Sequence, residues 1–137
     1  MKVLLDTSVY SQPLKKRPLD SVVSRWRMRP ESDYAISAMV ELEVLYGLHL
    51  KNSPPLFAFW EKLLKGRLPV LAFDNECAAV YARLQAGFSA AGFTKPQFDL
   101  MIASTALRHG LILATCNATD FAGIPGLVVE DWSTAGF

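Results

Sequence analysis

Short apolar runs alternate with longer stretches of helical periodicity along the whole chain, and this alternation is the strongest constraint on its fold. Five runs are typical of strands, namely Val3–Asp6, Tyr34–Ser37, Pro69–Phe73, Leu111–Thr115 and Leu127–Val129. Five stretches are typical of helices, namely Asp20–Met28, Ala38–Leu50, Pro55–Lys65, Asn75–Ala90 and Pro96–His109. Such alternation indicates a parallel sheet with helices on both faces. We therefore predict an α/β fold of three layers, with a central, mostly parallel five-stranded sheet flanked by helices.

The length of 137 residues predicts a single domain, 1–137, that buries a core without disulfides or a structural metal. Its two cysteines, Cys77 and Cys116, have no metal-ligand spacing, and we expect them to be reduced. The sequence has neither a signal-peptide pattern nor an apolar run of membrane-spanning length. These features predict a cytoplasmic protein without a membrane segment.

Charge and hydropathy bear on the partners. A net charge of +1 is too small for a surface that is basic throughout, so a site for a polyanion has to be local. Lys15, Lys16 and Arg17 form one basic cluster, for which a solvated surface is the ordinary explanation. The mean hydropathy of +0.21 is high for a small monomer. We expect a homodimer, which a monomeric mass in light scattering would contradict.

Acidic and amide side chains stand at the edges of several predicted elements, at Asp6, Glu43, Asp99, Asn117 and Asp120. In an open parallel sheet the first strand is commonly central, and ligands bind beyond the carboxyl ends of the strands where the winding reverses. Asp6 ends the first strand, and Asn117 follows the fourth. If these two strands are neighbours, Asp6 and the loop after Thr115 meet at one crevice.

Glu43 lies in a stretch so apolar that few faces of its helix can be fully solvated. Burying a carboxylate on such a face is costly unless the carboxylate is paired or coordinated. The ordinary alternative is a partly exposed Glu near a helix start, where the helix dipole favours a negative charge. Glu41 fits that alternative better than Glu43 does.

Asp99 lies near the start of the last long helical stretch. Thr94 and Gln97 have the spacing of a capping box with Pro96 in the first turn, so Asp99 is not needed as the cap. Asp99 then shares a face with Ile102, which is expected to pack on the sheet. An unpaired Asp is costly there. If the helix begins later, Asp99 is an ordinary N-cap and the functional interpretation weakens.

Taken together, these acids indicate a cation site. Two carboxylates about 4 Å apart repel each other by roughly 4 kcal/mol at an effective dielectric constant of about 20. A pocket that gathers several carboxylates therefore favours a divalent cation. Oxygen ligands suit Mg²⁺ or Mn²⁺, whereas Zn²⁺ prefers His or Cys. The histidines, His49 and His109, stand near predicted helix ends, where we expect them to interact with the helix dipoles.

Four stretches resemble, in order, the motifs of the PIN-domain family, and in particular of its VapC-like members, the ribonuclease toxins of type II toxin–antitoxin pairs. They are Leu4–Ser8, Glu43–Gly47, Asp99–Ala103 and Thr115–Phe121. A final Ile124–Leu127 followed by Glu130–Trp132 resembles the C-terminal strand of the family. The resemblance covers essentially the whole chain and implies a PIN-like fold.

The resemblance also implies the site. Asp6, Glu43, Asp99 and Asn117 match the catalytic set of the family. Asp6 and Asp99 match the principal ligands of one or two Mg²⁺ or Mn²⁺ ions, and Glu43 matches the supporting acid. Asn117 occupies a position where many relatives have Asp, and Asp120 is the acid that would replace it as a ligand.

Other matches concern the surroundings of those acids. Thr7, Ser8 and Thr115 would orient the metal ligands or waters by hydrogen bonds, without contacting the metal themselves. Cys116 stands where relatives often have a basic residue. The basic cluster 15–17 becomes a candidate RNA contact.

The function implied is that of a metal-dependent endoribonuclease, with RNA as substrate and a small antitoxin that blocks the acidic pocket. Transfer, ribosomal and messenger RNA all stay open as substrates. The chain has no arrangement typical of a protein nucleophile, so a metal-activated water is the expected nucleophile. The alternatives are a catalytically silent PIN-fold binding module and a nuclease that acts on DNA. A haloacid-dehalogenase-type enzyme is disfavoured because Ser8 stands where that family needs a second Asp.

Overall fold

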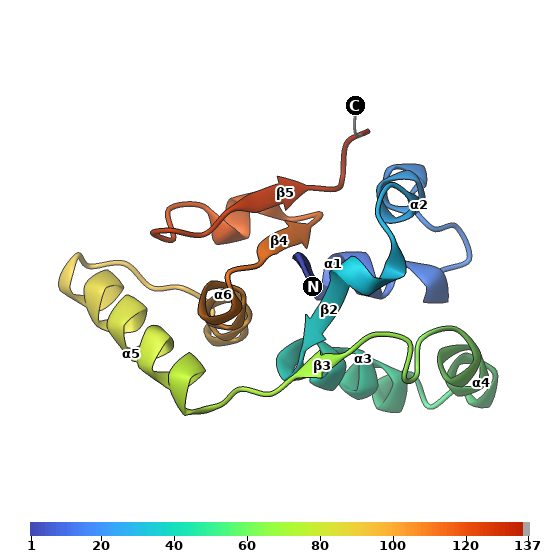
Figure 1. The fold of residues 1–137 in the computed structure, drawn as a ribbon. Coiled ribbons are helices and arrows are strands. Elements are labelled where there is room, and N and C mark those ends of the chain that lie inside the picture. The colour runs from blue at the N-terminus through green and yellow to red at the C-terminus, as the bar shows by residue number, and fades with distance from the viewer. Residues whose placement is uncertain (136–137) are drawn as a thin grey trace.

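The computed structural model describes residues 1–135, whose strands form one sheet in the order β3-β2-β1-β4-β5 (Figure 1). The strands are β1 (Val3–Leu5), β2 (Tyr34–Ser37), β3 (Val70–Leu71), β4 (Ile112–Thr115) and β5 (Val129–Asp131). Each strand is parallel to its neighbours. The predicted α/β fold with a central five-stranded sheet is confirmed, and β1 is its middle strand.

Helices cover the sheet on both sides. They are α1 (Thr7–Tyr10), α2 (Asp20–Arg27), α3 (Ala38–Lys51), α4 (Pro54–Leu63), α5 (Asn75–Ala90) and α6 (Gln97–His109), with short 3-10 helices η1 (Gln12–Leu14), η2 (Glu31–Asp33) and η3 (Ala118–Phe121). Figure 1 shows α5 and α6 on one side of the sheet and α2 on the other. Within residues 1–135, no helix has both the length and the apolar character needed to cross a membrane.

The centre of the core is β1, in which Val3, Leu4 and Leu5 are all fully buried. A parallel strand that is covered on both faces needs apolar side chains on both, which explains the unbroken apolar run before Asp6. Because β1 pairs with both β2 and β4, the carboxyl ends of these strands lie at one edge of the sheet. Any polar group just beyond them is therefore brought to the same place.

An aromatic cluster connects α1, α2, β2 and the segment that follows β5. Tyr10, Trp26, Tyr34 and Trp132 form a row in which neighbouring ring centroids are 6.5, 6.0 and 5.9 Å apart. Tyr10 and Trp26 are stacked and the other two pairs are edge-to-face, and aromatic pairs of both kinds add to the stabilisation from burial. The backbone N–H of Trp132 also donates to the carbonyl of Thr115 at 2.8 Å, which fixes the end of β4 where the candidate site begins.

Most predicted elements are found within two residues of their expected ends, but α1 was missed and β5 lies later than predicted. Helix α1 has only four residues, too few to show a helical period. Strand β5 was placed at Leu127–Val129 because of its apolar residues. The sheet instead pairs Leu113 with Val129, and Val128 is 60% exposed. An edge strand does not have to bury both faces, so apolarity alone misplaced it.

The predicted capping box before α6 is wrong. The helix begins at Gln97, Pro96 is its N-cap residue, and no side chain caps it. The alternative, in which Asp99 is the N-cap, is also wrong, because Asp99 lies inside the first turn. A carboxylate at that position is next to the positive end of the helix dipole, which favours its charged form.

Candidate functional site

Four acids approach the carboxyl edge of the sheet from four different elements. Asp6 directly follows β1, Glu43 lies in α3, Asp99 is in the first turn of α6, and Asp120 is in η3. The crevice expected between the first and fourth strands is present, because the backbone N–H of Asp6 donates to the carbonyl of Ala114 at 2.9 Å. The fold thus gathers residues that are far apart in the sequence.

Asp6 is the most buried of these acids, with 6% of its surface exposed. Its Oδ2 atom accepts hydrogen bonds from Ser8 Oγ at 2.9 Å and from Thr115 Oγ1 at 2.8 Å. Buried carboxylates need such donors to replace water. Because both hydroxyls bind the same oxygen, the carboxylate has a fixed orientation and its Oδ1 atom lies outside this pair of bonds.

The two hydroxyls are themselves held by the backbone of the loop after β4. Ser8 Oγ accepts from the backbone N–H of Cys116 at 2.9 Å, and Thr115 Oγ1 accepts from that of Asn117 at 3.0 Å. The loop, the hydroxyls and Asp6 therefore form one hydrogen-bonded network. Cys116 contributes its backbone to this network, which the sequence did not indicate.

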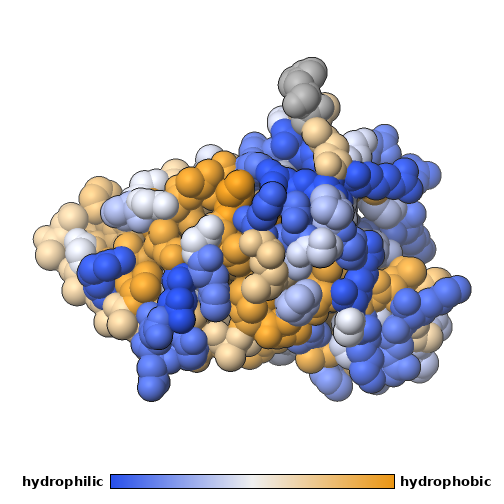
Figure 2. Space-filling view, viewed as in Figure 1, coloured by the Kyte–Doolittle hydropathy of each residue, from blue (hydrophilic) through white to orange (hydrophobic). Residues whose placement is uncertain are grey.

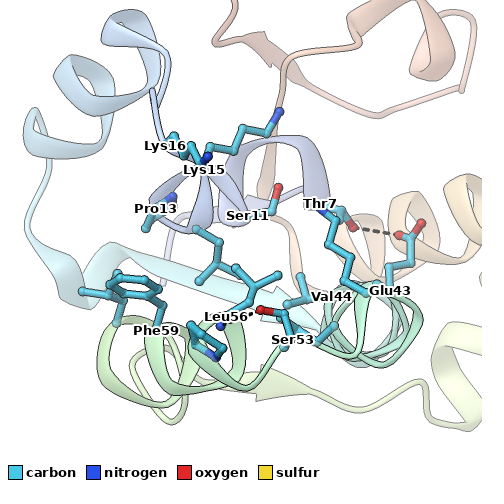
Figure 3. Close-up of a pocket in the computed structure, with 16 residues that line it drawn as sticks. Thr7, Ser11, Pro13, Lys15, Lys16, Glu43, Val44, Ser53, Leu56 and Phe59 are labelled. Carbon is cyan, nitrogen blue, oxygen red and sulfur yellow. Dashed lines mark hydrogen bonds between the residues drawn. The ribbon is translucent and has the colours of Figure 1, made fainter.

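Glu43 is oriented by α1. Its Oε1 atom accepts a hydrogen bond from Thr7 Oγ1 at 2.7 Å, drawn as a dashed line in Figure 3. Burial raises the pKa of Glu43, the bond from Thr7 lowers it, and the negative charge of Asp6 raises it further. Thr7, Ser8 and Thr115 all donate hydrogen bonds to the predicted acids, the first two from α1 and the third from the end of β4.

Asp99 has the largest shift among these acids. Its pKa is raised from 3.8 to about 6 by burial first, and then by the negative charges of Asp6, Asp120 and Glu43, while Lys95 acts in the opposite direction. Like charges raise a carboxyl pKa only when they are close enough to interact. The shift therefore indicates that all four acids share one electrostatic environment.

Asn117 and Asp120 have different surroundings although both are exposed. Asn117 is the N-cap residue of η3, and its side chain makes no capping bond. Asp120 lies one turn further on and acts on the pKa of Asp99. Of the two, Asp120 is the residue whose charge reaches the other acids.

The donor set fits a hard divalent cation in its chemistry, because it consists of carboxylate oxygens whose mutual repulsion a cation relieves. Asp6, Glu43, Asp99 and Asp120 are the residues that can hold it. In residues 1–135, no three His, Cys, Asp or Glu side chains stand close enough together to hold an ion as they are. Binding therefore requires these side chains to move closer to one another.

A groove of ≈ 870 Å³ runs from this site along α3 and α4 (Figure 3). Thr7 and Glu43 lie at one end, and its walls are apolar, formed by Val44, Leu48, Leu56, Phe59 and Leu63 among others. Lys15, Lys16 and Lys51 also line it, whereas Arg17 does not. The sequence did not reveal this groove, which exists because the chain turns between α3 and α4 at Asn52, in the left-handed conformation.

Glu41, taken from the sequence as an ordinary acid near a helix start, does lie in the first turn of α3. It is nevertheless half-buried, its Oε1 atom has no hydrogen-bond partner among the described residues, and burial raises its pKa. His49 and His109 lie in the last turns of α3 and α6, as expected.

Comparison with known proteins identifies the family. A family model described as "PIN domain" matches residues 3–127. The chain belongs to the PIN-domain family. Within it, the chain is VapC-like: it is 30% identical over 133 residues to "tRNA(fMet)-specific endonuclease VapC" of Shigella flexneri, which covers 97% of this chain and 99% of that protein. It is also 31% identical over 136 residues to "Toxin FitB" of Neisseria gonorrhoeae, and the alignment covers 95% of this chain and 98% of that protein.

Solved structures of PIN-domain proteins have the same fold. The DNA-bound VapBC of Salmonella typhimurium superposes with a TM-score of 0.83 at 30% identity, covering 96% of this chain and 98% of that one. FitAcB of Neisseria gonorrhoeae superposes with a TM-score of 0.85 at 27% identity, covering 95% of this chain and 97% of that one. The family and the PIN fold expected from the sequence motifs are therefore confirmed.

The raised pKa of Asp99 predicts a pH dependence of stability in the metal-free PIN domain. Between pH 3.8 and about 6 the folded state keeps a proton that the unfolded state has lost, so stability falls as the pH rises through this range. The variant Asp99→Asn cannot ionise. We expect it to be more stable than the wild type by about 1 kcal/mol near neutral pH, a value discounted because Asp99 is only half-buried.

Urea unfolding in the presence of a chelator measures this difference. The stabilisation by Asp99→Asn should disappear at about pH 4, where Asp99 is protonated in the folded wild type. A difference that stays constant between acidic and neutral pH would show that the four acids do not interact as described.

Proposed function

We propose that this PIN-domain protein is a Mg²⁺- or Mn²⁺-dependent endoribonuclease and the toxin of a type II toxin–antitoxin pair. The observation that carries the proposal is the convergence of acids from four elements beside Asp6, which Ser8 and Thr115 hold in one orientation. The raised pKa of Asp99, caused by burial and by the three other acids, supports it. Such a cluster is unfavourable without a cation and suits the binding of one. Relatives named "Ribonuclease VapC2" and "tRNA(fMet)-specific endonuclease VapC" support RNA as the substrate class.

The chain's own residues have separate parts in this chemistry. Asp6, Asp99 and Asp120 would hold the ion, with Glu43 as the supporting acid, and Ser8 and Thr115 keep Asp6 in one orientation. When bound, a Mg²⁺ or Mn²⁺ ion lowers the pKa of a water and offsets negative charge on a phosphate.

Other residues of the site and the groove would orient Glu43 or contact the RNA. Thr7 holds Glu43 at the entrance of the groove, where the ammonium groups of Lys15 and Lys16 are available to phosphates of the RNA backbone. Asn117, which matches the fourth catalytic position of the family, is exposed just before η3, and we propose that its amide contacts the RNA. We place the activity in the cytoplasm, which agrees with the two free cysteines.

Cleavage of a mixed pool of transfer and ribosomal RNA by the antitoxin-free protein tests this function. We expect discrete products with Mg²⁺ or Mn²⁺, none with a chelator, and none from Asp6→Asn or Asp99→Asn, because each substitution removes a charged ligand without changing the side-chain size. Asp20→Asn is the matched control, since Asp20 is exposed on α2. Its products should equal those of the wild type.

Two results would contradict the proposal. Metal-dependent cleavage that persists in both Asp6→Asn and Asp99→Asn would place the activity elsewhere. A folded wild-type protein that cleaves neither transfer nor ribosomal RNA would favour the silent binding module. One that cleaves only DNA would favour the DNA nuclease.

We further propose that the groove of ≈ 870 Å³ receives the antitoxin. Its apolar walls and three lysines are complementary to a peptide with apolar and acidic side chains. Figure 3 shows Glu43 and Phe59 at opposite ends of this groove, so a peptide that fills it reaches the acid site. The relative named "Toxin FitB" and the similar solved structures named VapBC and FitAcB support such a partner.

Phe59→Asp tests the groove. Phe59 is 55% exposed, so its replacement should leave the fold intact while placing a charge on an apolar wall. We expect the affinity for the cognate antitoxin, measured by calorimetry, to fall by about 10-fold or more, with RNA cleavage unchanged. Phe93→Asp, at a 66% exposed site outside the groove, is the control and should bind normally. Equal binding by both variants would exclude the groove.

The homodimer also stays a proposal. Leu42, Tyr46 and Leu50 are 44%, 62% and 67% exposed and lie one turn apart on α3. An apolar stripe of this kind is suited to an interface between two copies. Light scattering should give the mass of two 15.2 kDa chains, and the mass of one chain at micromolar concentration would contradict the proposal.

A further inference from the structure

A lysine joins two segments that each contribute an acid to the site. Lys95 stands in the connection between α5 and α6, four residues before Asp99, and is half-buried. Its Nζ atom donates a hydrogen bond to the carbonyl of Ala122 at 2.9 Å. Ala122 is two residues after Asp120. The bond therefore links the start of α6 directly to the end of the turn that holds Asp120.

Lys95 is held firmly on its own side of this link. Helix α5 ends at Ala90 and is followed by Gly92 at a φ of +80°, and the backbone N–H of Phe93 donates to the carbonyl of Phe88 at 2.8 Å. This arrangement fixes the direction in which the chain leaves the helix. The ammonium group of Lys95 also lies 5.6 Å from the centre of the Phe88 ring, a favourable cation–π distance.

The other side of the link is a compact turn. The backbone N–H of Asp120 donates to the carbonyl of Asn117 at 3.0 Å, and that of Ala122 donates to the carbonyl of Thr119 at 3.3 Å. Because these bonds make residues 117–122 one unit, an anchor on the carbonyl of Ala122 restrains the position of Asp120. The ammonium group is also near enough to Asp99 to oppose the repulsion between Asp99 and Asp120.

We propose that Lys95 is a positioning residue that holds the Asp120 turn against the start of α6 and so keeps Asp120 beside Asp99 for cation binding. This inference rests on the proposed metal-dependent function. It assigns to Lys95 no contact with the cation or with RNA. Its effect on the site passes through the carbonyl of Ala122 and hence through Asp120.

Whether removal of Lys95 weakens or tightens Mn²⁺ binding distinguishes a positioning role from an effect of its positive charge alone. A positive charge near the acids disfavours a divalent cation, so if Lys95 acted by its charge alone, removing it would tighten Mn²⁺ binding. If Lys95 positions Asp120, removing it weakens Mn²⁺ binding, because the two carboxylates are no longer held together. Substitution of residues that support metal ligands typically weakens metal affinity by about 10-fold to 100-fold.

Titration of the purified, RNA-free protein with Mn²⁺, followed by electron paramagnetic resonance, measures the affinity directly. We expect Lys95→Met to raise the Kd by about 10-fold, and Lys95→Arg, which keeps the charge and donors, to stay near the wild type. Lys62→Met, at an exposed lysine of α4, is the matched control and should leave the Kd unchanged. A thermal melt of each variant confirms that it is folded.

A double-mutant cycle with Asp120→Asn tests whether Lys95 affects Mn²⁺ binding through Asp120. If Lys95 acts through Asp120, Lys95→Met should change the Kd far less in the Asp120→Asn background than in the wild type. Equal effects in both backgrounds, or tighter binding by Lys95→Met, would overturn the inference. Absence of Mn²⁺ binding by the wild type itself would instead contradict the proposed function.

Discussion

The two hydrogen bonds that Ser8 and Thr115 donate to Asp6 are the interaction on which the rest of the candidate site depends. Asp6 is almost fully buried at the end of the central strand, where a carboxylate without donors is strongly disfavoured. Ser8 lies in α1, two residues after Asp6, whereas Thr115 ends β4, so the bond from Thr115 exists only when β1 and β4 are paired. Through the backbone N–H groups of Cys116 and Asn117, the same hydroxyls fix the loop that leads into η3. The orientation of one acid and the path of the segment that supplies another are thus set together.

Electrostatic repulsion is the complementary constraint. The sheet and its helices place Glu43 and Asp99 near a carboxylate that is already held in position. Burial first, and then the negative charge of Asp6, raise the pKa values of both. The structure offsets only part of this repulsion, through Thr7 on Glu43, the first turn of α6 around Asp99, and the ammonium group of Lys95. A divalent cation would offset the rest, which is the physical basis for proposing a metal-dependent activity at this site. Figure 2 shows mixed apolar and polar surface on the visible face.

The sequence predicted the fold and most of the acids because these depend on local patterns. The apolar run before Asp6 identifies a buried strand. Glu43 is a charged residue in an otherwise apolar stretch, so it draws attention wherever the helix begins or ends. Other features depend on contacts between distant segments. The bond from Lys95 to Ala122 joins residues 27 positions apart, and the groove depends on how α4 packs beside α3. The start of α6 lies within one residue of its predicted place, but Thr94 and Gln97 have the spacing of a capping box that the chain does not form. Whether Asn117 or Asp120 is closer to the other acids depends on the turn of η3, which a sequence pattern does not define.

The most direct test of the account is a crystal structure of the antitoxin-free protein soaked in Mn²⁺, with the ion located by its anomalous scattering. The account predicts an anomalous peak at the carboxyl edge of β1 and β4, bound by oxygens of Asp6 and Asp99, with Asp120 or Glu43 turned toward it. Absence of a peak there at saturating Mn²⁺, or a peak bound by other residues, would contradict the claim that these acids form a cation site.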